Sequence, residues 1–101
     1  MTYELARKLK EAGFPGNFAY INEGKEAWEH AGGKDLLPTS DELINELGDK
    51  FRCLYHEVHI RFVPYCAEGT NEKGEILPAR GGEGPLEALA ALYCAIHEKN
   101  D

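Results

Sequence analysis

Apolar residues recur at helical spacing near the start of the chain. Leu5 and Leu9 stand four positions apart, and Thr2 and Gly13 have the residue types of a helix N-cap and of a helix C-terminal stop. The spacing therefore predicts a first helix over about residues 3–12.

A second amphipathic stretch lies near the middle of the chain. Thr39 and Glu42 have the spacing of a capping box, in which each side chain accepts a hydrogen bond from the other residue's backbone N–H. Leu43 and Leu47 supply an apolar side, and Gly48 is a typical C-terminal stop. We expect a second helix here.

The longest apolar stripe at helical spacing is in the C-terminal part. Gly84 and Pro85 have the residue types of an N-cap and of a first helical position. A final helix with a broad apolar side is predicted, and that side consists of Leu86, Leu89, Ala90, Tyr93 and Ile96.

Aromatic and β-branched residues dominate residues 51–64, which is typical of strands. We expect two strands here, with a break near residues 57–60, and residues 64–67 finishing the second strand. After a turn at residues 71–74, a third strand is expected over residues 75–79. This strand should lie at an edge or end early, because a proline lacks the N–H that a ladder needs.

Two further features of the pattern concern turns. Residues 18–21 and 26–29 flank a turn that contains Gly24, and they predict an N-terminal β-hairpin. The glycine-rich residues 81–84 lack the lysine ending of a phosphate-binding loop, and they predict a flexible connection from strand to helix.

Together these elements predict a single α+β domain over residues 1–101. A small antiparallel sheet, made of a three-stranded meander plus the N-terminal hairpin, would be packed by three helices that bury their apolar stripes on it. With 101 residues, of which 43% are apolar, the chain can build one small core.

The second half of the chain is similar in its order of elements to double-stranded-RNA-binding domains. In that family the start of the last helix carries lysines that face phosphates. The matching residues 83–87 here read Glu-Gly-Pro-Leu-Glu. We therefore expect no RNA binding by that route.

Three blocks of sequence resemble small uncharacterised proteins of phages and prophages. The blocks are residues 3–15, residues 37–51, and the glycine-rich turn before the Leu-Glu-Ala-Leu helix at residues 86–89. The resemblance implies a phage or mobile-element context, and it supplies no activity and no catalytic residue.

The chain is acidic, with a formal net charge of −7. Residues 21–50 hold eight acidic and three basic side chains, and residues 83–101 hold four acidic side chains and one lysine. Such a domain is repelled by phosphate backbones, so direct binding of nucleic acid is disfavoured. The acidity fits either ordinary solubility or a face that docks on a basic surface.

The chain contains no apolar run near the ~18 residues of a membrane span and no signal-peptide pattern at its start. Its three cysteines are an odd number, which favours reduced thiols. We expect a cytoplasmic protein of a bacterial host, without disulfides.

The leading functional hypothesis is a non-enzymatic, acidic protein-interaction module without a cofactor. It would inhibit or regulate a nucleic-acid-processing host protein by docking on its basic surface. Aromatic anchors ringed by charge are typical of interfaces, although the same aromatics could close a second small core. The candidate partner-binding residues are Tyr20, Glu23, Glu26, Trp28, Glu29, Asp35, Asp41 and Glu46.

The alternative hypothesis is a small zinc-stabilised domain that uses Cys53, His59, Cys94 and His97. Cys94 and His97 could share one side of a helix, whereas Cys53 and His56 would point to opposite faces of a strand. Homodimerisation through the exposed strand near residue 76 or through the final helix fits either hypothesis.

A cysteine nucleophile, Cys53 or Cys66 with His56 or His59 as base, is disfavoured. Reactive thiolates need a basic neighbourhood or a helix N-terminus, and these cysteines stand in apolar strands of an acidic chain.

Overall fold

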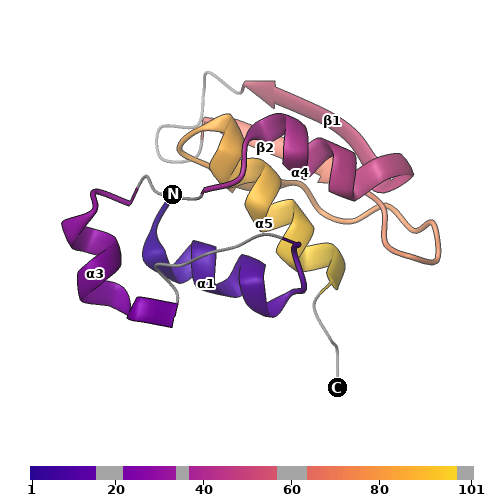
Figure 1. Ribbon diagram of the computed structural model, residues 1–101. Coiled ribbons are helices and arrows are strands. Elements are labelled where there is room, and N and C mark those ends of the chain that lie inside the picture. The colour runs from indigo at the N-terminus through magenta and orange to yellow at the C-terminus, as the bar shows by residue number, and fades with distance from the viewer. Residues whose placement is uncertain (16–21, 34–36, 57–63, 98–101) are drawn as a thin grey trace.

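The structure, a computed structural model, describes residues 1–15, 22–33, 37–56 and 64–97. It has the predicted α+β class, with helices packed on a small antiparallel sheet (Figure 1). The elements are α1 (Tyr3–Glu11), α3 (Lys25–His30), α4 (Ser40–Leu47), the 3-10 turn η1 (Gly48–Lys50), β1 (Phe51–His56), β2 (Tyr65–Gly69), β3 (Arg80–Gly82) and α5 (Pro85–His97).

The sheet has the order β1-β2-β3, with both pairs antiparallel. Leu54 of β1 lies opposite Ala67 of β2, and both belong to the side of the sheet that packs on the core. Since successive residues of a strand point to opposite faces, the neighbouring pairs lie on the other face. These pairs are Cys53 with Glu68 and Tyr55 with Cys66.

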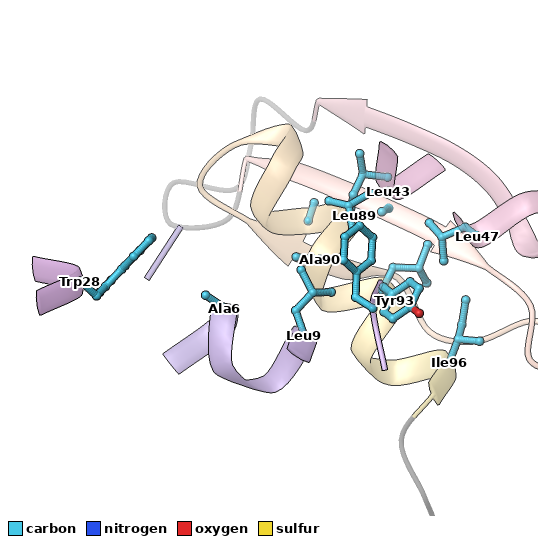
Figure 2. Packing of buried hydrophobic residues seen from close by; sticks show 13 residues of the cluster. Ala6, Leu9, Trp28, Leu43, Leu47, Leu89, Ala90, Tyr93 and Ile96 are labelled. Carbon is cyan, nitrogen blue, oxygen red and sulfur yellow. The ribbon is translucent and has the colours of Figure 1, made fainter. Parts of the chain in front are cut away.

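Helix α5 is the centre of the core, between the sheet on one side and α1 and α4 on the other (Figure 2). Leu89 and Tyr93 of the predicted stripe are buried, and so are Ala88 and Leu92, which the stripe did not include. The reason is that the helix is covered on two sides. Gly69 of β2 faces Leu92, and the ring of Tyr93 meets the ring of Phe14 edge to face, 5.3 Å between centroids.

The predicted helix starts are confirmed. The Thr2 hydroxyl oxygen accepts from the backbone N–H of Leu5 at 3.2 Å, and Thr39 accepts from the N–H of Glu42 at 3.2 Å. The second half of the capping box differs from the prediction, because the Glu42 carboxylate accepts from the Thr39 hydroxyl at 3.2 Å. The side chains of the pair thus bind each other as well as the backbone.

The second strand of the predicted N-terminal hairpin is wrong, because residues 25–30 form helix α3. Lys25 and Glu29 pair across one turn, with Nζ and Oε1 3.9 Å apart, and Trp28 of the same helix is buried. Helix-compatible residues with one buried ring outweigh the short-range hairpin signal. The first predicted strand, residues 18–21, lies outside the described residues.

The third strand lies later in the chain than predicted. Ile76 makes only an isolated bridge to Thr70, and the strand that pairs with β2 is Arg80–Gly82. Pro78, which lacks an N–H donor, stands between the two. Within this strand, position 82 needs a glycine, because a Cβ there would stand 2.5 Å from the backbone nitrogen of Ala88. Of the residues 81–84 predicted as a flexible connection, Gly81 and Gly82 therefore belong to an edge strand that lies against α5, and only residues 83–84 connect strand and helix.

Of the two strands predicted over residues 51–64, β1 is the first, and the predicted break near residues 57–60 lies outside the described residues. β2 begins at Tyr65 and continues to Gly69, two residues beyond the predicted end.

Candidate functional site

The predicted partner-binding residues fall into three groups. Glu23, Glu26, Glu29, Asp41 and Glu46 are exposed. Trp28 is buried, with 3% of its surface exposed. Tyr20 and Asp35 lie outside the described residues.

Trp28 is a core residue rather than an exposed anchor. Its ring packs against Gly33, where a Cβ would stand 2.7 Å from the ring carbon Cζ2, and Gly33 has a positive φ of 65°. It lies at the end of the buried cluster nearest Ala6 of α1 (Figure 2). The alternative interpretation of the aromatics, that they complete a core, therefore holds for this tryptophan.

Helix α4 presents an acidic side to solvent. Leu43 and Leu47 are buried and Ile44 is partly buried beside them, so the helix period turns the other positions outward over an arc of roughly 140°. The exposed positions of this arc and of the turn that follows are Asp41, Glu42, Asn45, Glu46 and Asp49. We call these five residues the α4 acidic face.

The charges of the α4 acidic face are largely uncompensated. Among the described residues, no basic nitrogen lies within ion-pair distance of Asp41, Glu46 or Asp49. Helix α4 contains no lysine or arginine, and the next basic residue, Lys50, is half-buried. Asp41 stands in the first turn, where the helix dipole favours a negative charge, so the fold tolerates this acid without a salt bridge.

Glu46 lies on the edge of this face nearest to α5. Burial is the main cause that raises the pKa of the Tyr93 phenol, and the charge of Glu46 adds to it. The acidic side chain thus acts electrostatically on the C-terminal part of α5.

Helix α3 is less suited than α4 to dock on a basic protein surface. Its Glu29 is paired with Lys25, and that lysine stands on the same short helix as Glu26. The excess of acidic over basic side chains is therefore smaller on α3, which replaces part of the predicted hairpin, than on α4. Two acids of the α4 acidic face, Glu42 and Asp49, were not among the predicted partner-binding residues. Glu42 was predicted only as part of the capping box, and the signal for Asp49 was the pattern of outward positions continuing past Gly48.

The cysteines and histidines do not gather into a metal site within the part of the chain that the structure describes, where no group of three His, Cys, Asp or Glu could hold an ion. Cys53, Cys94 and His97 are therefore not brought together, and His59 lies outside the described residues. Cys53 instead donates its S–H to the Glu68 carboxylate, with Sγ and Oε2 3.0 Å apart. This hydrogen bond, with burial and the Glu68 charge, raises the pKa of the Cys53 thiol, and only Arg52 opposes it. A raised pKa disfavours the thiolate that a nucleophile or a zinc ligand needs.

A groove of about 640 Å³ lies between α1 and α5, with β3 at its side. Leu5, Ala91 and Ala95 give it an apolar lining, and Lys8 and Arg80 are among the polar residues that line it. Nothing in the sequence pattern indicated this groove, because it joins residues far apart in the chain.

Comparison of the chain with known protein families, curated proteins and solved structures found no match. None of the helices described is both long and apolar enough to cross a membrane.

Proposed function

We propose that this chain is a non-enzymatic protein-binding module, of the accessory type that phages and mobile elements encode, which docks on a basic surface of a protein partner through the α4 acidic face. The partner class that fits best is a nucleic-acid-processing protein. Such proteins hold phosphate backbones with lysine and arginine, and an acidic face competes for the same side chains.

One observation carries this proposal. The solvent side of α4 holds Asp41, Glu42 and Glu46 with no basic residue on the helix, and Asp41 and Glu46 have no ion-pair partner among the described residues. Acids that serve solubility alone are usually interspersed with bases, as on α1, where Arg7 and Glu11 pair at 3.4 Å. The helix also offers a rigid base, because its inner residues Leu43 and Leu47 are core residues.

The test compares three forms of the protein. The first is the wild type. The second, D41N/E46Q/D49N, removes three charges from the α4 acidic face, and it leaves Glu42 in its hydrogen bonds with Thr39. The third, E4Q/E72Q/E83Q, removes three exposed charges from other parts of the surface. The two variants have the same net charge, so any difference between them reports the position of the charges.

Each form is immobilised and exposed to nuclease-treated bacterial lysate at about 50 mM and about 500 mM salt, where screening lengths differ about threefold. The proposal expects one retained protein at low salt, released at high salt, and retained by the dispersed variant but not by the α4 variant. Equal retention by both variants, or equal loss, contradicts docking through α4. Circular dichroism of all three forms separates loss of binding from loss of fold.

A further inference from the structure

The groove between α1 and α5 combines an apolar lining with two cations. Helices α1 and α5 lie side by side (Figure 1), and the short side chains of Ala12, Ala91 and Ala95 leave room between them. Leu5 adds a larger apolar group from α1. The groove is thus a feature of two rigid helices rather than of a loop.

Two positive charges at this groove have no counterion in the described residues. Lys8, on α1, and Arg80, on β3, form neither an ion pair nor a side-chain hydrogen bond there.

The other polar groups of the lining do not cancel these charges. The Glu11 carboxylate is bound by Arg7, with Oε1 and Nε 3.4 Å apart. His97 is half-buried and its ring stacks near that of Tyr93, with centroids 4.3 Å apart. The net charge of the protein is negative. At physiological salt, however, charges more than about 8 Å away are largely screened, so a ligand in the groove interacts mainly with the adjacent cations.

The size of the groove limits its occupant. Its lining spans Leu5 to Ala12 on α1 and Ala91 to His97 on α5, which is roughly 10 Å at the helical rise. Small-molecule sites typically have volumes of about 300–1,000 Å³, and the groove's 640 Å³ lies in that range.

We propose that the groove between α1 and α5 binds a small organic anion with an apolar body, its carboxylate held by Lys8 and Arg80 and its hydrocarbon part lying on the alanine-rich lining. The guanidinium of Arg80 offers a pair of parallel donors that fits a carboxylate, and Lys8 adds a point charge. This site is independent of the α4 acidic face, so either proposal stands if the other fails.

The experiment titrates the ¹⁵N-labelled protein with octanoate and follows amide resonances. Octanoate is expected to bind with a dissociation constant on the order of 1 mM or tighter, and the shifts should be confined to α1, α5 and Arg80. The variant K8Q/R80Q should bind about tenfold more weakly, because it loses both charge contacts. The matched control K25Q/K73Q removes two exposed lysines outside the groove and should bind as the wild type does.

Three further probes separate the contributions. 1-Octanol has the chain without the charge, octylammonium has the opposite charge, and inorganic phosphate has charge without the chain. Weaker binding of all three than of octanoate supports the proposal. Equal binding of octanol, with no effect of K8Q/R80Q, shows an apolar groove without anion selection and overturns it. Equal binding of phosphate, or no shifts in the groove up to about 10 mM octanoate, overturns it as well.

Discussion

Replacing Gly82 by alanine tests the contact between the edge strand and the central helix. A Cβ at this position would stand 2.5 Å from the backbone nitrogen of Ala88, 2.7 Å from the Cβ of Glu87 and 2.8 Å from its carbonyl carbon. These neighbours are mainly backbone, and they cannot rotate away as a side-chain end would. Either β3 or the first turn of α5 must shift.

The cost follows from that overlap. Overpacking a well-packed site destabilises by about 1–3 kcal/mol, and the lower entropy of an unfolded chain with alanine offsets about 0.5 kcal/mol. The net loss of about 0.5–2.5 kcal/mol should lower the melting temperature by about 2–20 °C in a domain of this size. Urea unfolding gives the free energy directly.

Gly81→Ala is the matched control. Gly81 is exposed and is the neighbour of Gly82 in β3, so its side chain would point to the opposite face. Its free energy of unfolding should stay within about 0.5 kcal/mol of the wild type. If Gly82→Ala and Gly81→Ala have the same effect, β3 does not lie against α5 as described.

Three further predictions concern stability. Thr39→Ala should cost about 1 kcal/mol by removing the cap of α4, and Thr39→Ser should restore most of it; equal loss in both would contradict a capping role. Leu92→Ala, at a fully buried site, should cost about 2–5 kcal/mol in urea unfolding, and the half-buried Leu86→Ala clearly less; the reverse order would contradict the core. Burial, and secondarily the charge of Lys50, lower the pKa of His97 below its ordinary 6.5, and the charges of Glu72 and Glu46 raise this pKa by a smaller amount. The unfolded chain therefore binds a proton at this residue first, so stability should fall as pH decreases below about 6.5, and His97→Gln should flatten that decline; an unchanged slope would contradict the assignment.

Local signals in the sequence predicted the parts of the fold that local physics determines. Thr2 and Thr39 cap helices as their side-chain chemistry requires, and Gly13 ends α1 with a positive φ of 95°. The apolar stripe of α5 could be predicted because the spacing of apolar residues along a helix can be identified without knowing which elements the helix packs against. The α+β class followed from the order of these elements.

The predictions that failed depended on contacts between distant residues. Nothing near Trp28 in the sequence says that its ring is buried and that residues 25–30 are therefore helical. The late position of β3 depends on Gly82, which is needed beneath Ala88 of another element. The groove of Lys8 and Arg80 likewise forms only when α1, β3 and α5 come together.

The central claim, that the α4 acidic face docks on a basic protein surface, is tested most directly by association kinetics with the protein captured from lysate. The rate constant for the wild type should fall steeply between about 20 mM and 200 mM salt, as for electrostatically steered encounters. D41N/E46Q/D49N should associate more slowly and with a weaker salt dependence, whereas E4Q/E72Q/E83Q should stay close to the wild type. Equal rates and equal salt dependence for the two variants would contradict the claim.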